Sequence, residues 1–418
     1  MSNADSIKGR IDEHVIPTYA RFDLALTHGE GCHLFDADGK RYLDLGSGIA
    51  TSCLGHGHPE LAEGLTQQAG KLTHVSNLYY TQPQGILAEK LVQLAGGSGK
   101  VFFCNSGAEA NETLYKLARL CNHEEGQFEI LTTLGSFHGR TLAGIAATGQ
   151  TKVKEGFAPA VEGFRHVPYG DLDAISEAIS PATGAILVEP IQGESGIHCA
   201  TPEYLLGLRT LCNERNLLLL LDEVQCGHFR TGNFFGWQTI MSAYPDFSPD
   251  ACSMAKSLAA GLPMGAIWAS EPLQDVLGPG THGTTFGGSP LVCAHALKAL
   301  EIIERDDLAK NAVEIGNYFA KQIGKLITGY PGVLQEVRGL GLMIGIELSE
   351  NIAAFAESKK PASVQIVNLL HEAGLITIPA GARVFRLLPP LNISKTDADE
   401  GLSIIEGVVK ELAPRNTS

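Results

Sequence analysis

The chain has 418 residues, and its 31 basic and 46 acidic side chains give a formal net charge of -15. This negative charge repels nucleic-acid phosphates and anionic lipids, so we expect no nucleic-acid partner and no membrane partner. With 44% hydrophobic and 18% charged residues, the composition is typical of a globular α/β protein. The length allows two or three domains.

Nine cysteines are scattered singly between Cys32 and Cys293 without a C-x-x-C pair, which argues against a disulfide framework and against a zinc site. The first residues contain no apolar segment typical of a secretion signal, and the longest pure leucine run, at 217–221, is too short to span a bilayer. We therefore expect a cytoplasmic protein without a metal. His56 and His58 stay unassigned, because a histidine pair without carboxylate partners is poor evidence for a metal site.

The predicted elements change in character along the chain. Near the start, two short strands flank Asp38-Gly39, a dipeptide that favours a tight hairpin. From about residue 85, short apolar strands alternate with helices, which is typical of a sheet covered on both faces. These strands are expected at 101–104, 129–134, 185–190 and 217–222. After residue 290, long helical patterns and a strand pair within 337–348 predict a separate C-terminal α/β domain.

The first candidate for chemistry is the turn that opens a helix at Ser106-Gly107-Ala108-Glu109. The free N–H groups and dipole of a helix N-terminus attract anions, and a glycine there allows a phosphate to approach closely. The same four residues satisfy the S-x-x-E capping box, which occurs in many helices that bind no ligand. Taken alone, the pattern therefore favours a purely structural role.

Two nucleotide-binding motifs do not fit this sequence. The segment GGSGKV fails the Walker pattern, because Leu94 occupies the position of its first glycine and Val101 follows Lys100. GLGLMIG does not have the G-x-G-x-x-G spacing. Nucleotide hydrolysis and nicotinamide-dependent oxidation are therefore disfavoured.

Two further polar residues follow apolar strands. Asp222 ends the strand of LLLLLDEVQCG, at the edge where open α/β sheets bind ligands. Its carboxylate can pair with a protonated pyridine nitrogen, although a strand-end aspartate can equally cap the next turn. Lys256 lies among small residues, and partial burial would lower the pKa of its amine and let it attack an aldehyde. Most lysines are solvated, so Lys256 becomes a candidate only together with the other two segments.

These three segments occur in one order with several other motifs, namely NSGAEANE, SFHGRTL, VEPIQGESG, LDEVQ, HGTTFGGSPL and FRLLPPL. In this order the chain resembles the class-III aminotransferases over almost its whole length. It is particularly similar to the acetylornithine members, through PTYARFDLALTHGEGCHLFDADGKRYLDL, GIATSCLGHGHPEL and HVSNLYYTQPQ.

The resemblance implies an α/β fold like that of aspartate aminotransferase, which is pyridoxal-phosphate (PLP) fold type I. A large domain would contain a mostly parallel seven-stranded sheet between helices, and a smaller α/β domain would be formed from both termini. The expected division is an N-terminal segment of the small domain at 1–60, a large cofactor-binding domain at 61–295 and a C-terminal small domain at 296–418.

The same resemblance implies pyridoxal 5'-phosphate as the cofactor, with Lys256 as the catalytic lysine that binds it. Ser106, Gly107 and Ala108 would hold the phosphate. Thr285 would reach the same phosphate from the neighbouring subunit, which implies a homodimer with shared active sites.

The ring of the cofactor would be held by four further residues. By the resemblance, Phe137 would stack on one face and Val224 would pack on the other. Asp222 would pair with the ring nitrogen, and Gln225 would contact the ring hydroxyl. Phe137 could instead be an ordinary core aromatic residue.

Two arginines suit a dicarboxylate substrate, because a guanidinium group matches two carboxylate oxygens. The resemblance implies that Arg386 binds the α-carboxylate of glutamate. Arg140 would bind the distal carboxylate, or the α-carboxylate of an acylornithine. Glu194 could neutralise Arg386 when a substrate offers it no carboxylate, although loop glutamates are usually exposed to water. Thr284 of the partner chain would lie close to the substrate.

By the resemblance, the chain moves the terminal amine of N2-acetyl-L-ornithine to 2-oxoglutarate, giving N-acetylglutamate 5-semialdehyde and glutamate in arginine biosynthesis. Thr284 stands where the family often has serine, so succinylornithine, succinyl-diaminopimelate, ornithine and 4-aminobutyrate remain alternative amines. Gly48, Ile49 and Ala50 occupy the segment where ornithine members tend to carry a tyrosine, which favours a blocked α-amine. A non-catalytic relative is a further alternative, which the retained lysine and arginines argue against.

Overall fold

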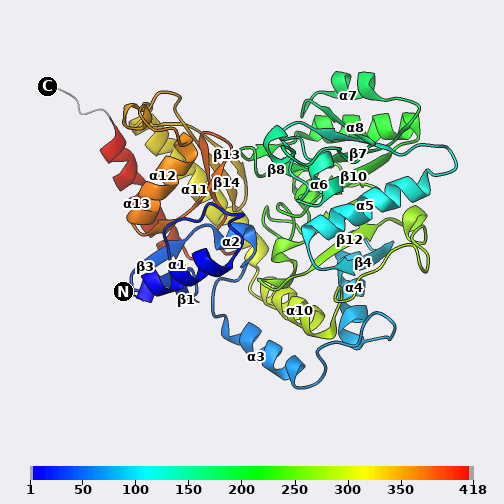
Figure 1. Cartoon of the computed structure of the whole chain (residues 1–418), viewed down its shortest axis with the longest axis horizontal. Coiled ribbons are helices and arrows are strands. Elements are labelled where there is room, and N and C mark those ends of the chain that lie inside the picture. The colour runs from blue at the N-terminus through cyan, green and yellow to red at the C-terminus, as the bar shows by residue number, and fades with distance from the viewer. Residues whose placement is uncertain (1–2, 414–418) are drawn as a thin grey trace. The chain divides into compact units, whose positions relative to one another are not determined.

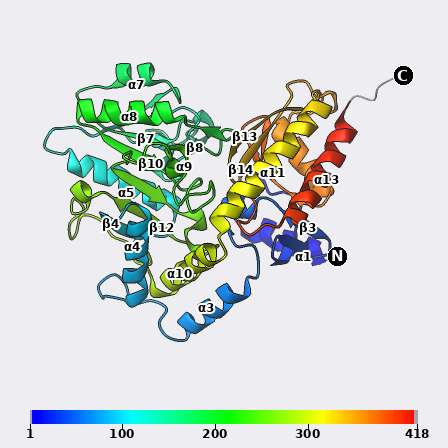
Figure 2. The ribbon, with the colours of Figure 1, turned by 180° about the vertical axis from the view of Figure 1, so that it is seen from behind.

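The computed structural model describes residues 3–413. The chain forms two compact units, which are Glu63–Lys310 and the described residues of Met1–Ala62 with Asn311–Ser418. Figures 1 and 2 show the ribbon of both units from opposite sides. The domain division predicted from the sequence at 60/61 and 295/296 stays a prediction.

The larger unit is built on a seven-stranded sheet with the order β4-β12-β11-β10-β7-β5-β6. The strand β12 runs antiparallel to β11 and β4, whereas the other pairings are parallel. The mostly parallel seven-stranded sheet predicted from the sequence is therefore confirmed. Its strands are β4 (Lys100–Cys104), β5 (Glu129–Thr133), β6 (Phe164–Val167), β7 (Thr183–Val188), β10 (Leu218–Asp222), β11 (Ala251–Met254) and β12 (Gly265–Ala269).

The leucine run of β10 explains why helices cover both faces of this sheet. Leu219 and Leu221 are fully buried in a core with residues of α8 (Pro202–Arg215) and α10 (Pro290–Arg305). Leu220 is fully buried in a second core with residues of α5 (Gly107–Cys121). Because successive side chains of a strand point to opposite faces, a continuous apolar run needs a helix layer on each side. Figure 1 shows β7 and β10 between α8 and α5.

The larger unit contains several shorter elements around this sheet. A two-stranded hairpin, β8 (Ile191–Gln192) with β9 (His198–Cys199), follows β7. The remaining helices of this part of the chain are α3 (Pro59–Ala69), α4 (Gln82–Leu94), α6 (Leu142–Ala147), α7 (Leu172–Ala178) and α9 (Gly236–Ile240).

The smaller unit combines strands from both ends of the chain in one sheet, with the order β1-β2-β3-β15. In it, β3 (Arg41–Asp44) pairs in parallel with β15 (Leu375–Ile376), which confirms a smaller α/β domain formed from both termini. The predicted hairpin is also present, because β2 (His33–Asp36) pairs antiparallel with β3 and the turn contains Gly39 at a φ of 86°. The first strand of the sheet is β1 (Leu26–Glu30).

A second four-stranded sheet of this unit has the order β13-β14-β17-β16. The predicted strand pair is found as β13 (Leu334–Leu340) and β14 (Met343–Leu348), followed by β16 (Ile378–Ala380) and β17 (Val384–Leu387). The accompanying helices are α1 (Asn3–His14), α2 (Ser47–Ala50), α11 (Leu308–Gly329), α12 (Ala362–Glu372) and α13 (Lys395–Leu412). Over residues 3–413, no helix has the length and apolarity that crossing a membrane would require.

Candidate active site

The turn between β4 and α5 is capped by Ser106, whose Oγ accepts the backbone N–H of Glu109 at 3.2 Å. The second half of the predicted capping box is different. Glu109 Oε2 accepts from the backbone N–H of Asn105 and from its side-chain amide, at 2.9 Å for the amide. Asn105 can offer two donors to one carboxylate oxygen, so it replaces Ser106 as the partner of Glu109. The helix still presents its first N–H groups at Gly107, as an anion site requires.

Three segments meet at Gly107, namely the turn before α5, the end of β10 and the segment of Lys256. A Cβ atom at Gly107 would lie 2.8 Å from Val224 Cγ1 and 3.5 Å from Ala255 Cβ. Val224 follows β10, and Ala255 immediately precedes Lys256. Because any side chain would clash with Val224, only glycine allows this approach. The fold thus brings the turn before α5, the end of β10 and the lysine segment together.

Asp222 ends β10 and is 3% exposed. Its Oδ2 accepts hydrogen bonds from Asn111 Nδ2 at 2.7 Å and from His138 Nδ1 at 2.8 Å. Its Oδ1 accepts the backbone N–H of Val224 at 3.0 Å. Burial by itself would raise the pKa of the Asp222 carboxyl, but His138, Asn111 and the Val224 N–H together lower this pKa below its ordinary value. The site therefore holds a buried negative charge that can attract a cationic ring nitrogen.

The loop after β5 is fixed at three points around Phe137 and His138. The backbone N–H of Phe137 donates to Glu189 Oε2 at 3.1 Å, and that of His138 donates to Thr148 Oγ1 at 2.9 Å. The His138 ring donates to Asp222, as described above. Phe137 is half-buried, and the exposed guanidinium of Arg140 lies 5.5 Å from the centre of its ring. The loop also approaches the first turn of α5, because a Cβ at Gly139 would lie 2.9 Å from that of Ala108.

Glu189, at the end of β7, is a buried acid beside these groups and is 5% exposed. Burial, followed by the charge of Asp222, raises the pKa of Glu189 well above its ordinary value, whereas the Phe137 N–H and Lys256 act in the opposite direction. This raised pKa favours the neutral form of Glu189. In that form it can hold the Phe137 backbone without adding a second negative charge next to Asp222.

Lys256 begins a single 3-10 turn, Lys256–Ala259, directly after β11 and Ala255. Its backbone lies in the left-handed region at a φ of 47°, which is unfavourable for a residue other than glycine and is common at functional sites. The side chain is half-buried, and the next residue, Ser257, is buried. The lysine thus follows a buried strand and precedes a buried turn.

Gln225 and Glu194 lie together, because Gln225 Nε2 donates to Glu194 Oε1 at 3.3 Å. Gln225 is 8% exposed, and a Cβ at Gly193 would overlap its side-chain amide. This contact joins the loop after β8 to the turn after β10. The predicted contact of Gln225 with a ring hydroxyl and the predicted role of Glu194 stay predictions.

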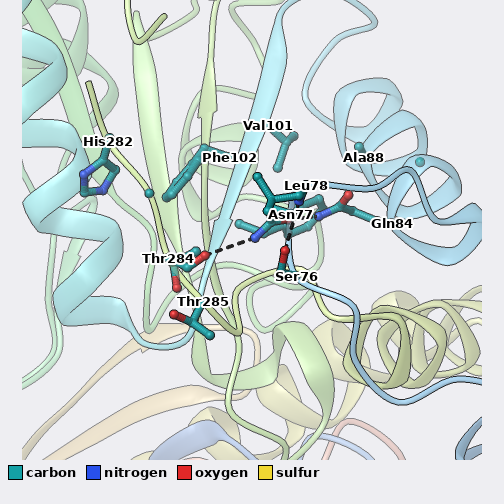
Figure 3. A pocket seen from close by; sticks show the side chains of 13 residues that line it. Ser76, Asn77, Leu78, Gln84, Ala88, Val101, Phe102, His282, Thr284 and Thr285 are labelled. Atoms are coloured by element: carbon teal, nitrogen blue, oxygen red, sulfur yellow. Dashed lines mark hydrogen bonds between the residues drawn. The ribbon is translucent and has the colours of Figure 1, made fainter. Parts of the chain in front are cut away.

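Thr284 and Thr285 line a cavity of about 620 Å³, shown in Figure 3. Asn105 Nδ2 donates to Thr284 Oγ1 at 3.0 Å, so this segment lies next to the turn before α5 of the same chain. Asn77 Nδ2 donates to the carbonyl oxygen of Thr284 at 3.2 Å. Thr285 itself is exposed. Its predicted reach into a neighbouring subunit stays a prediction.

Arg386 lies in the smaller unit, on β17, and is 1% exposed. Its Nη2 donates to the carbonyl oxygen of Pro379 at 3.0 Å. A guanidinium this deeply buried needs acceptors for its N–H groups, because an uncompensated buried charge is costly. Its predicted pairing with a substrate carboxylate stays a prediction.

Several histidines of the smaller unit lie close to carboxylates. His56 Nε2 lies 2.8 Å from Asp44 Oδ2, so the assumption that this histidine has no carboxylate partner was wrong. His33 Nε2 lies 4.0 Å from Asp397 Oδ1 and 3.8 Å from Glu400 Oε2. The predicted absence of a metal stays a prediction.

The match to a family model decides what kind of protein this geometry belongs to. The model described as "Aminotransferase class-III" matches residues 16–409. The chain belongs to the class-III aminotransferase family. Acetylornithine aminotransferase of Gloeobacter violaceus is 44% identical over 410 residues, which cover 97% of this chain and 98% of that protein. The enzyme of the same name from Methanocaldococcus jannaschii is 42% identical over 399 residues, covering 94% and 95%.

Solved structures of aminotransferases have the same fold. The acetylornithine aminotransferase of Elizabethkingia anophelis gives a TM-score of 0.83 at 32% identity, covering 98% of this chain and 100% of that chain. The ornithine aminotransferase of Toxoplasma gondii gives a TM-score of 0.90 at 30% identity, covering 99% and 96%. As a class-III aminotransferase, the chain is a transaminase of a pyridoxal-phosphate-dependent family.

The residues of this class-III aminotransferase fit pyridoxal phosphate. The close approach of Val224 and Ala255 requires glycine as the first residue of α5, and a glycine at a helix N-terminus lets a phosphate come near the backbone N–H groups. Asp222 is held ionised out of contact with water, which suits a protonated pyridine nitrogen. Lys256 follows Ala255 at the same point of the fold.

Three residues of this class-III site were not predicted from the sequence, namely Asn111, His138 and Glu189. Each lies within a motif that carries the family resemblance. Their partners are distant in sequence: Asn111 is 111 residues from Asp222, and His138 is 84 residues from it. The motifs were a signal that these positions matter, but local spacing could not show which group each one contacts.

Glu223 follows Asp222 but belongs to a different polar cluster. Its Oε2 accepts the backbone N–H of Gly236 at 2.8 Å and the thiol of Cys226 at 3.0 Å, and its Oε1 accepts the N–H of Trp237 at 2.8 Å. Burial raises the pKa of Glu223 to about 7 although these donors lower it.

This pKa predicts how stability depends on pH. An acid whose pKa rises from 4.5 in the unfolded chain to about 7 in the native state keeps its proton in the native state over that range. The free energy of unfolding should therefore fall from pH 4.5 to pH 7 by on the order of 3 kcal/mol through this group alone. Denaturant unfolding of the apoprotein should show this decline relative to Glu223→Gln. Parallel pH profiles for the two proteins would contradict it.

Proposed function

We propose that the chain transfers the terminal amine of N2-acetyl-L-ornithine to 2-oxoglutarate, forming N-acetylglutamate 5-semialdehyde and glutamate. This reaction would serve arginine biosynthesis. The main support is the near full-length identity of 42–44% to enzymes named acetylornithine aminotransferase. The convergence of the anion-binding turn, Asp222 and the Lys256 segment at Gly107 supports the chemistry.

Bound pyridoxal phosphate would supply an electrophilic carbon and a ring that accepts electrons. Lys256 would bind the cofactor through Nζ. After the substrate amine releases it, Nζ would take up the proton from the carbon that carries this amine. Asp222 would keep the ring nitrogen protonated. Phe137 and Val224 would cover the two ring faces and exclude water, and Gln225 would contact the ring hydroxyl.

The phosphate of the cofactor would be held by backbone N–H groups at Gly107 and Ala108 and by Ser106. We propose a homodimer in which Thr285 of one subunit completes the phosphate site of the other. The surface near Thr285 supports an interface, because large apolar side chains there are strongly exposed, and such patches usually bind a partner. These side chains are Leu78 at 85%, Tyr79 at 68%, Tyr80 at 107% and Phe286 at 64%.

Two arginines and a glutamate would recognise the substrates. Arg386 would bind the α-carboxylate of glutamate, and Arg140 would bind its distal carboxylate or the α-carboxylate of acetylornithine. Glu194 would neutralise Arg386 during the half-reaction with acetylornithine. The hydrogen bond from Gln225 supports a fixed position for the Glu194 carboxylate. Thr284 of the partner subunit would lie close to the substrate.

A second candidate substrate is free ornithine, since the ornithine aminotransferase of Toxoplasma gondii gives a TM-score of 0.90. Its free α-amine would need a polar partner. Residues 48–50 provide none from their side chains, because they are glycine, isoleucine and alanine. This segment favours a blocked α-amine. The cytosol is the proposed compartment, because the nine cysteines are free thiols and suit a reducing environment.

Single-turnover kinetics test the substrate. The loaded enzyme should lose its visible absorption faster with N-acetylornithine than with ornithine, succinylornithine, succinyl-diaminopimelate or 4-aminobutyrate, and 2-oxoglutarate should restore it. Lys256→Ala should not form a borohydride-stable adduct with the cofactor. If another amine reacts faster, that amine is the substrate and N-acetylornithine is not. Failure of the wild type to bind pyridoxal phosphate would refute the whole proposal.

Mixed dimers test the shared site. If each site uses Lys256 of one subunit and Thr285 of the other, a dimer of one Lys256→Ala and one Thr285→Ala subunit has one intact site. Refolding the two inactive or weakened variants together should restore about one quarter of wild-type activity, since half of the dimers are mixed and each has one good site. Activity no higher than the average of the separate variants would contradict sharing.

A further inference from the structure

The segment 281–286, which we call the threonine turn, carries both threonines that the proposed function assigns to the partner's site. Its tip is only partly packed, because Thr285 is exposed and Phe286 is 64% exposed, while Asn105 and Asn77 bond to Thr284. A turn that must deliver a hydroxyl to a phosphate needs a defined position before the ligand arrives, since a loose turn would lose affinity when it is ordered.

His282 anchors the threonine turn to α5. Its Nε2 lies 3.0 Å from Thr113 Oγ1, and its Nδ1 lies 2.9 Å from Lys116 Nζ. Lys116 Nζ also donates to the carbonyl oxygen of Thr281 at 2.7 Å. The His282 ring packs against Phe102 with 5.0 Å between ring centres. Figure 3 shows His282, Phe102 and both threonines around the same cavity.

These contacts determine the protonation state of the His282 ring. The Lys116 ammonium can only donate, so Nδ1 of His282 must accept. The ring proton therefore lies on Nε2 and is donated to Thr113 Oγ1. Thr113 is free to accept it, because its own hydroxyl donates to the carbonyl oxygen of Glu109 at 2.8 Å. Every donor in the chain of contacts has an acceptor only when the ring is neutral.

The surrounding charges favour the same neutral form. Burial, followed by the positive charge of Lys116, lowers the pKa of His282, whereas Glu112 and Glu109 raise it by less. These charged groups all lie on α5, and Phe102 of β4 adds only an apolar face. Protonation in acid would remove the acceptor for Lys116 and place two cations side by side.

We propose that His282 is a positioning residue, which clamps the threonine turn between Thr113 and Lys116 so that Thr285 meets the phosphate of the cofactor in the partner subunit. The inference rests on the proposed function, because that function places Thr285 at the phosphate. His282 itself touches neither cofactor nor substrate in this account. It acts through the position of Thr285.

Two substitutions separate the halves of the clamp. In His282→Asn the side-chain oxygen can still accept from Lys116, but the contact with Thr113 is lost. In His282→Gln the amide can still donate to Thr113, but the acceptor for Lys116 is lost. His123→Asn is the matched control, because His123 is exposed just beyond the end of α5. As controls, thermal melting of the apoproteins should show that the variants are folded, and light scattering should show that they have the same oligomeric state as the wild type.

The measurement is the dissociation constant of pyridoxal phosphate, obtained by titrating each apoprotein and following visible absorption. Each His282 variant should bind the cofactor about tenfold more weakly, the loss expected for one polar contact, and His123→Asn should bind like the wild type. The double variant of His282→Gln with Thr285→Ala should be no weaker than Thr285→Ala alone, because both changes remove the same contact. Additive losses would overturn the clamp.

The pH dependence of cofactor affinity separates this positioning role from a purely structural role of His282, which would leave that dependence unchanged. Below the ordinary histidine pKa of 6.5, the wild type should lose cofactor affinity as His282 gains a proton, beyond the loss that the phosphate itself causes. His282→Gln should retain only the loss that the phosphate causes. If Thr285→Ala weakens cofactor binding but both His282 variants bind like the wild type, the positioning role of His282 is wrong and the proposed role of Thr285 is unaffected. If Thr285→Ala has no effect on binding, the proposed role of Thr285 is wrong, and so is that of His282.

Discussion

A carboxylate that remains ionised inside the protein is the constraint on which the larger unit depends. Asp222 is 3% exposed, and burial alone would favour its protonated form. Its charge is retained because Asn111 and His138 donate to one oxygen and the Val224 N–H donates to the other. These donors come from α5, from the loop after β5 and from the turn after β10. The sheet must therefore place three separate segments around one strand end.

Helix α5 links this charge to the other parts of the site. Its first residue, Gly107, contacts the turn after β10 and the lysine segment, so one helix presents both the proposed phosphate-binding end and a donor to Asp222. Further along, Thr113 and Lys116 hold the threonine turn. A rigid helix spaces these groups at fixed intervals, which gives the site a defined geometry without a ligand. Burial nearby raises the pKa of Glu189, which favours its neutral form beside Asp222.

The sequence predicted what local patterns determine. Apolar runs located four of the seven strands of the central sheet, and Ser106 was recognised as the start of a helix, because period and capping depend on neighbouring residues. Contacts between distant segments were not predictable. The bond between His138 and Asp222 spans 84 residues, and the raised pKa of Glu189 depends on burial that exists only after folding. A role that needs a second subunit, such as the one proposed for Thr285, lies beyond what one folded chain determines.

Nitrogen-15 NMR of labelled pyridoxal phosphate bound to the protein tests the central claim most directly. If the Asp222 carboxylate is ionised and pairs with the ring, the pyridine nitrogen should be protonated at neutral pH in the wild type. The same nitrogen should lose its proton in Asp222→Asn, which keeps the shape of the side chain but removes its charge. An unprotonated ring nitrogen in the wild type, or an unchanged protonated one in the variant, would contradict the account.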